Sequence, residues 1–158
     1  MAEIGMIVEE LQAMPRFLRE AFSSLPHEKA AAKLGDGEFS LVEHACHLRD
    51  FDREGSYVRV CRILEENNPK LEDFPGSTLA VERRYSDQNL QAAVNAFATE
   101  RARVTGILAA LDREQLERKA RFGPLGQMTL FGLAEALLDH DRTHRREIEQ
   151  LLRGLQTR

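Results

Sequence analysis

Residues 136–148 read ALLDHDRTHRREI, and this stretch determines how the rest of the chain is interpreted. At helical spacing it belongs to a longer stripe: Leu130, Leu133, Leu137, His140, His144, Ile148 and Leu151. Steps of three and four residues place these side chains on one face of a helix. His140 and His144 are the polar exceptions, and both point inward from consecutive turns. They need partners, because an unsatisfied buried polar group costs about 1–3 kcal/mol.

Composition and charge indicate a globular helical protein. The chain has 158 residues, of which 42% are hydrophobic and 30% are charged. This length suits one domain with a substantial core, so we expect a single domain over residues 1–158. Helix-forming residues dominate, and the long segments repeat at helical period, which predicts an all-α fold. A net charge of −4 without a run of like charges argues against nucleic-acid binding, which needs clustered Lys and Arg.

Two further features predict a cytoplasmic protein. No window approaches 18 continuous apolar residues, and the N-terminal segment lacks the apolar core of a signal peptide. We therefore expect no contact with a membrane. Cys46 and Cys61 lie in one predicted helix, about 22 Å apart along its axis, so they cannot form a disulfide within the chain. We expect both to be buried, reduced thiols, as is usual in the cytosol.

Four long helices are predicted, which suits a four-helix bundle. They span residues 3–24, 40–66, 86 or 87 to 111, and 129 onward. Pro15 should kink the first helix or start a second one there, because it removes a backbone donor. Ser40 is a good N-cap for the second helix, and Glu43 completes a capping box. Thr129 caps the fourth helix.

Long connections precede and follow the second helix. Residues 26–38 form the first connection, and residues 67–85 form a polar stretch that lacks strong periodicity. The second connection is long for a bundle, so it either carries the chain from one end to the other or covers a site. Residues 112–118 could add a short helical turn, and residues 121–128 form a loop with two glycines and a proline.

The second helix also has histidines on its inward face. One of its stripes reads His44, His47, Phe51, Glu54, Val58 and Cys61. A metal ion held by three neutral imidazoles, with positions left for water or substrate, is a common catalytic arrangement. His140 and His144 could supply two ligands, and the second helix a third. The alternative is a polar network in the core, with the histidines bonded to Glu54, Asp141 or one another.

Residues 39–50, FSLVEHACHLRD, resemble the helix-2 signature of the DinB/YfiT-like superfamily, Trp-Ser-x-x-Glu-x-x-x-His-Leu. Residues 126–130, GQMTL, followed by His140 and His144, are similar to the C-terminal motif of the same family. The resemblance implies a four-helix bundle in up-down-down-up order. It also implies a divalent metal ion bound by three histidines, here His47, His140 and His144. Phe39 stands where the family prefers Trp. Phenylalanine keeps a large apolar side chain at the start of the helix but lacks the indole N–H donor.

Several polar residues near this set have more than one interpretation. His44 could be a fourth ligand, a group that contacts a ligand or the substrate, or a satisfied core histidine. Glu54 could be a general base or a carboxylate at the rim, and we favour the rim. Arg101, on the inward stripe of the third helix, could snorkel to the rim or face the site. We expect the remaining polar residues of interest to be solvated: His27, Arg142, Arg145 and Arg146.

Two classes of function follow. Three imidazoles with open positions suit Zn²⁺, Ni²⁺, Cu²⁺ or Fe²⁺. In a metalloenzyme the ion lowers the pKa of a bound nucleophile. Water would give hydrolysis of a small-molecule substrate, and a low-molecular-weight thiol would give S-transfer, as the family resemblance also implies. The alternative is a non-catalytic metal-binding or structural bundle, such as a stress-response dimer, and a homodimer through a helix face fits either class.

Overall fold

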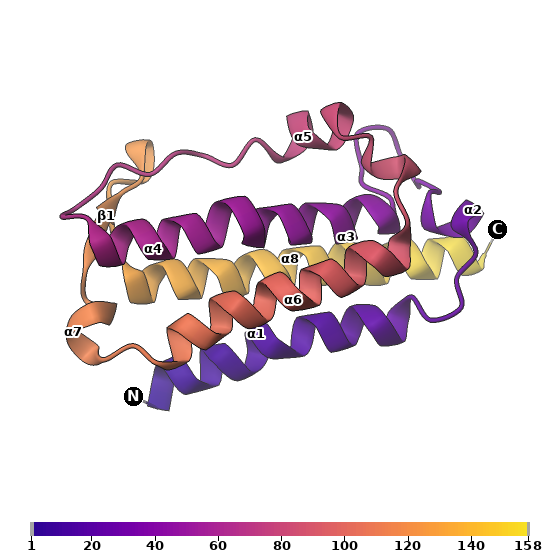
Figure 1. Cartoon of the computed structure of the whole chain (residues 1–158). Coiled ribbons are helices and arrows are strands. Elements are labelled where there is room, and N and C mark those ends of the chain that lie inside the picture. Colours follow the sequence, from indigo (N-terminus) through magenta and orange to yellow (C-terminus); the bar gives the residue numbers. More distant parts are fainter. Residues whose placement is uncertain (1, 158) are drawn as a thin grey trace.

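The computed structural model describes residues 2–157, and it is mostly helical (Figure 1). The helices are α1 (Ala2–Ala21), α2 (His27–Ala30), α3 (Leu41–Asp50), α4 (Tyr57–Glu65), α5 (Gly76–Glu82), α6 (Leu90–Ala109), α7 (Arg113–Leu116) and α8 (Leu130–Gln156). A π-helical segment, Phe51–Ser56, joins α3 to α4. Two strands, β1 (Lys119–Arg121) and β2 (Gln127–Thr129), and two 3-10 turns, Tyr85–Asp87 and Gly123–Leu125, complete the described elements.

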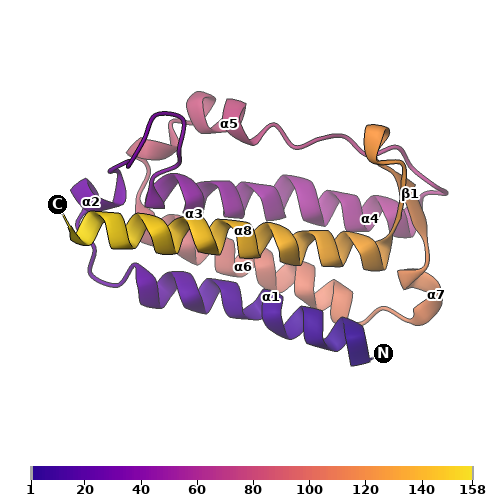
Figure 2. The ribbon, with the colours of Figure 1, turned by 180° about the vertical axis from the view of Figure 1, so that it is seen from behind.

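The long helices lie side by side, seen from opposite sides in Figures 1 and 2. They are α1, the continuous rod made of α3, the π segment and α4, then α6 and α8. The connection from α4 to α6 runs back along the outside of the α3–α4 rod and carries α5 (Figure 1). Among the described residues, no helix combines the length and apolar character needed to cross a membrane.

The expectation of an all-α fold was wrong in one detail. β1 and β2 pair as an antiparallel hairpin, with Lys119 opposite Thr129 and Arg121 opposite Gln127. Gly123 and Gly126 adopt φ values of +54° and +75° in the turn. Glycine reaches such values without steric cost, so the two glycines that indicated a loop also allow the strands to pair.

Capping predicted the starts of two long helices. The Ser40 hydroxyl accepts a hydrogen bond from the Glu43 amide at 3.3 Å, and the Glu43 carboxylate accepts one from the Ser40 amide at 3.0 Å. Thr129 accepts a hydrogen bond from the amide of Gly132 at 3.0 Å, as predicted for the N-cap of α8.

Other boundaries differ from the prediction. The third long helix, α6, begins at Leu90 after the N-cap Asn89, because residues 85–87 form a separate 3-10 turn. Both predicted connections contain short helices, α2 in the first and α5 in the second. α7 is the short turn expected after the third long helix.

Pro15 lies inside α1, which continues through it, so the alternative of a second helix starting there was wrong. Proline has no backbone N–H, and it therefore leaves the carbonyl four residues earlier without its helical donor. That carbonyl belongs to Leu11, and it accepts a hydrogen bond from Nη1 of Arg101 at 2.9 Å. A side chain from α6 thus replaces the hydrogen bond that Pro15 removes.

Arg101 is fully buried and uses every one of its N–H groups. It pairs with Asp52 of the π segment, with Nε to Oδ2 at 2.7 Å and Nη2 to Oδ1 at 3.2 Å. It also pairs with Asp141 of α8, at 2.5 Å from Nη1 and 2.9 Å from Nη2. With the Leu11 carbonyl, these bonds satisfy all the guanidinium donors. The snorkelling alternative for Arg101 was therefore wrong.

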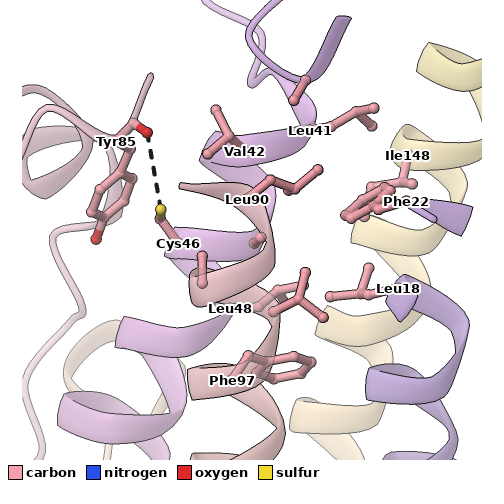
Figure 3. Packing of buried hydrophobic residues seen from close by; sticks show 14 of the residues in the cluster. Leu18, Phe22, Leu41, Val42, Cys46, Leu48, Tyr85, Leu90, Phe97 and Ile148 are labelled. Atoms are coloured by element: carbon pink, nitrogen blue, oxygen red, sulfur yellow. Dashed lines mark hydrogen bonds between the residues drawn. The ribbon is translucent and has the colours of Figure 1, made fainter. Parts of the chain in front are cut away.

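The buried polar groups divide the apolar core in two. One cluster lies around Phe22, Leu48 and Phe97, and Figure 3 shows its side chains converging from the long helices. The other cluster lies around Ile63 and Leu108. On α6, Arg101 lies between Phe97 of the first cluster and Val104 of the second. On α8, Asp141 and the histidines lie between Leu138 of the second cluster and Ile148 of the first. The polar layer thus crosses the bundle between the two clusters.

Replacing Arg101 tests how much this layer contributes to stability. The Arg101→Met variant leaves the Asp52 and Asp141 carboxylates buried without a countercharge, so we expect it to lose about 3–5 kcal/mol of unfolding free energy. Arg103 pairs with Glu100 at the surface of the same helix, so Arg103→Met should cost less than about 1 kcal/mol. Urea unfolding of both variants gives the comparison, and equal losses would contradict the structural role of Arg101.

Candidate metal centre

Four histidines from two helices meet in the polar layer. His44 and His47 come from α3, one turn apart, and His140 and His144 come from α8, also one turn apart. The Nε2 atoms of His47 and His140 are 3.2 Å apart, and those of His140 and His144 are also 3.2 Å apart. These three histidines form a group whose ligand atoms could bind one metal ion. The structure therefore brings together the three residues that the family resemblance implied.

The distances from Nε2 of His140 to the Nε2 atoms of His47 and His144 fit a shared cation. Nitrogen ligands about 2.0–2.1 Å from a metal ion lie about 2.9–3.4 Å from one another in octahedral or tetrahedral geometry. Hydrogen bonds alone do not explain both contacts well, because Nε2 of a neutral His140 holds either one proton or one lone pair and so makes a good hydrogen bond to only one of its two neighbours. Three inward nitrogens at ligand spacing thus fit a metal ion better than a closed hydrogen-bond network.

Burial keeps all four imidazoles neutral in the metal-free protein. Desolvation lowers the pKa of His44 and of His47 to about 4. Desolvation, followed by the charges of neighbouring groups, lowers the pKa of His140 to about 3 and of His144 to about 2. A neutral imidazole has a free nitrogen lone pair for a metal ion, so the histidines have the protonation state that a ligand needs.

Packing fixes two of the three rings. The ring of Phe51 stacks on His140 with a centroid distance of 4.0 Å and an interplanar angle of 17°. The backbone of Gly76 lies against His47, and a Cβ atom there would be 2.7 Å from Cε1 of the imidazole. Among the described residues, Nδ1 of His47 and Nδ1 of His140 have no hydrogen-bond partner.

His144 is held differently, by a hydrogen bond to His44. Their Nδ1 atoms are 2.9 Å apart, and both rings are buried. Glu147 lies beyond this pair, with Oε2 at 3.8 Å from Nε2 of His44 and 3.9 Å from Nδ1 of His144. The three residues form a second group that could hold a cation, and it shares His144 with the first.

A cavity of about 290 Å³ opens beside His44 and His144. Glu38 and Glu147 supply carboxylates to its wall, and Leu34, Phe39 and Leu151 supply apolar surface. Burial, and then the charge of Glu38, raise the pKa of Glu147. The described residues of the lining include neither Lys nor Arg, so the cavity is acidic and partly apolar.

Glu54 is a surface residue of the α3–α4 rod. Its carboxylate pairs with Arg83, with Nη2 to Oε1 at 3.0 Å, and its side chain is 42% exposed. It makes no hydrogen bond to the histidines, so the structure favours the rim interpretation over a general base. The π segment displaces the predicted stripe, because its extra residue rotates the following turns. Glu54 and Val58 are exposed, whereas Asp52 and Val60 are buried.

Sequence patterns missed the network that holds the α5 connection over His47. Asp50 is buried and accepts hydrogen bonds from Arg49 at 2.7 Å, Arg83 at 2.9 Å and the Tyr85 hydroxyl at 2.5 Å. Arg83 and Tyr85 follow α5, so these bonds fasten the connection to α3. The sequence contains no signal beyond a single aspartate within the predicted helix 40–66, which is too common to be informative.

The remaining predicted residues lie away from the histidines. Cys46 is buried, and desolvation raises the pKa of its thiol to about 11, whereas Cys61 is only half-buried. The prediction of two buried thiols was therefore right for Cys46 alone. His27 is exposed, as predicted, at the start of α2. The arginines predicted to be solvated are all exposed: Arg142, Arg145 and Arg146.

The comparison with known families agrees with the fold and the histidine motif. The sequence model of the DinB superfamily matches residues 10–148. The chain belongs to the DinB superfamily. This match includes both the α3 motif and the histidine pair of α8. No curated protein matches the chain.

Among solved structures, the DinB-superfamily chain is similar to YfiT from Bacillus subtilis. The TM-score is 0.88 at 18% sequence identity, and the alignment covers 96% of this chain and 87% of that chain. YfiT is described as a probable metal-dependent hydrolase with an unusual four-helix bundle topology. At this identity the likeness establishes a shared fold, and function has to be argued from the site.

The contact between Gly76 and His47 gives a prediction on stability. We expect Gly76→Ala to lose about 1–3 kcal/mol of unfolding free energy, because the new Cβ overlaps the imidazole. Gly106 lies in α6, where an added Cβ would meet no described side chain within 4 Å, so Gly106→Ala should gain about 0.5–1 kcal/mol. Thermal or urea unfolding compares the two, and a stabilising Gly76→Ala would refute the contact.

The lowered histidine pKa values predict how stability depends on pH. The unfolded histidines titrate near 6.5, whereas the folded ones titrate at about 4 or below. As the pH falls below 6.5, the unfolded chain binds more protons and is favoured. Unfolding free energy measured with a chelator should therefore fall by about 1 kcal/mol per buried histidine from pH 7 to 5.5. A His144→Phe variant should show a shallower fall, and a flat wild-type profile would contradict neutral buried rings.

Proposed function

We propose that this protein is a metal-dependent hydrolase of small molecules, with a divalent ion bound by His47, His140 and His144. The observation that carries the proposal is the convergence of three Nε2 atoms, with that of His140 3.2 Å from that of His47 and from that of His144. Two further findings support the proposal. The chain belongs to the DinB superfamily, and it shares a fold with a protein described as a probable metal-dependent hydrolase. A three-histidine site leaves coordination positions open, which distinguishes a catalytic site from a closed structural one.

Zn²⁺, Ni²⁺ and Fe²⁺ all suit this donor set. Such an ion acts as a Lewis acid and lowers the pKa of a bound nucleophile. The chain contributes position and environment: α3 and α8 fix the three ligands, and Phe51 and Gly76 cover two of the rings. The nucleophile would be water or a thiol, and Glu54, considered above as a general base, pairs with Arg83 at the surface instead.

The cavity beside His144 is the proposed substrate site. Its two carboxylates, Glu38 and Glu147, and its lack of a basic side chain favour cationic or neutral substrates over anionic ones. This charge disfavours transfer from an anionic low-molecular-weight thiol, the other reaction that the sequence suggested. Hydrolysis is therefore the reaction we favour, and a non-catalytic metal-binding bundle is the alternative.

Several structural predictions accompany the proposal. We propose an up-down-down-up order of the long helices. In Figure 1, α1 and α8 run in one direction, and α3–α4 and α6 run in the opposite direction, which supports this order. A single domain over 1–158, a cytoplasmic location, a homodimer and the absence of nucleic-acid binding stay predictions.

Metal analysis of the purified protein tests the ligand set. We expect about one equivalent of Zn²⁺, Ni²⁺ or Fe²⁺ in the wild type, because the three histidines together supply the protein ligands of one metal site. His47→Ala, His140→Ala and His144→Ala should each lose the metal under chelator competition, whereas His27→Ala, at an exposed position, should keep it. Circular dichroism confirms that each variant is folded.

Activity separates the enzyme from the structural bundle. Hydrolysis of a panel of neutral and cationic esters and amides, with and without added thiols, should depend on the metal and disappear in the three variants. Metal bound equally well after any of the three substitutions would refute the ligand set. Stoichiometric metal without hydrolysis or thiol transfer of any substrate would favour the non-catalytic alternative.

A further inference from the structure

We infer that His44 is a positioning residue for His144: it accepts a hydrogen bond from Nδ1 of His144 and so directs Nε2 of that ring toward the metal. The inference rests on the proposed metal site. It assigns one of the three roles that the sequence left open for His44, and it makes His44 neither a ligand nor a passive core residue.

The short contact between the two rings is the starting observation. Nδ1 of His44 and Nδ1 of His144 are 2.9 Å apart, which is a normal hydrogen-bond distance. The ring centroids are 5.1 Å apart, and the planes are nearly perpendicular, at 81°. The side chain of His44 is 2% exposed. A buried contact of this length needs one proton between the two nitrogens.

Metal binding requires that proton to be on His144. A neutral imidazole carries one N–H and one lone pair. If Nε2 of His144 is a ligand, its proton must be on Nδ1, and His144 is then the donor to His44. The Nδ1 atom of His44 is the acceptor, so the proton of His44 is on Nε2. Ligation at one nitrogen therefore fixes the tautomers of both rings.

His144 is the one ligand of the three with such a partner among the described residues. Nδ1 of His47 and Nδ1 of His140 have none, and those rings are fixed by packing against Gly76 and Phe51 instead. Hydrogen bonds to the outer nitrogen of a ligating histidine set its tautomer and orientation, and their loss lowers metal affinity. Loss of His44 should therefore affect the metal through His144 alone.

A second metal ion bound by His44, His144 and Glu147 is the competing interpretation. These residues could hold a cation, and Oε2 of Glu147 is 3.9 Å from Nδ1 of His144. A neutral His144 has a single lone pair, however, so it cannot ligate at both nitrogens. Ligation at Nε2 thus excludes ligation at Nδ1 unless the ring loses its second proton. The short contact to His44 favours the hydrogen bond.

Three variants separate these interpretations. Asn places an amide oxygen at the position of the imidazole Nδ1, so His44→Asn keeps the acceptor, whereas His44→Leu removes it. In competition with a chelator, we expect His44→Leu to weaken Zn²⁺ binding about 10- to 100-fold and His44→Asn by no more than about threefold. Glu147→Gln should also change the affinity by no more than about threefold, because Glu147 is not a ligand in this assignment.

A second readout does not depend on metal affinity. Long-range ¹H–¹⁵N correlation spectra of ¹⁵N-histidine-labelled protein report which nitrogen of each ring is protonated. We expect the proton on Nδ1 in His144 and on Nε2 in His44 in the wild type loaded with Zn²⁺. We expect the same arrangement in the metal-free protein, because the Glu147 carboxylate, 3.8 Å from Nε2 of His44, favours a proton on that nitrogen.

The outcomes distinguish this inference from the proposed function. Wild-type affinity in His44→Leu, a proton on Nδ1 of His44, or a second equivalent of Zn²⁺ that Glu147→Gln abolishes would each overturn the role of His44 and leave the metal site standing. If the wild type binds no metal, the proposed function fails, and the spectra still decide the hydrogen bond: the expected tautomers support it and the reverse tautomers overturn it.

Discussion

The buried guanidinium of Arg101 sets the relative positions of the helices that carry the histidines. It bonds to Asp52, five residues after His47, and to Asp141, the residue after His140. It also takes the Leu11 carbonyl that Pro15 leaves without a donor. One side chain from α6 thus fixes α1, the π segment and α8 at the level of the four histidines, and α3 and α8 then present their imidazoles to each other.

The three histidines of the proposed metal site are supported unequally. His47 is confined by the backbone of Gly76, and His140 by the face of Phe51, whereas His144 has a polar partner in His44. Packing restricts where a ring lies, but a hydrogen bond also determines which nitrogen carries the proton. His144 is also the member of the triad that borders the cavity, so the ring beside the proposed substrate site is the one with a defined tautomer.

Local patterns in the sequence predicted much of this arrangement. The α8 stripe and the caps at Ser40 and Thr129 identified two long helices, because these signals depend on neighbouring residues alone. The role of Arg101 and the π segment were missed, since both depend on contacts between distant segments. Glu54 was placed on an inward stripe because a regular helical period was assumed, and the π segment breaks that period.

A crystal structure of the protein loaded with Zn²⁺, with anomalous data collected at the zinc absorption edge, is the most direct test of the three-histidine site. We expect one strong anomalous peak between the Nε2 atoms of His47, His140 and His144, at about 2.0–2.1 Å from each. We also expect Nδ1 of His44 to remain hydrogen-bonded to His144. A peak coordinated by His44 and Glu147, or no peak among the histidines, would show that the three-histidine site is wrong.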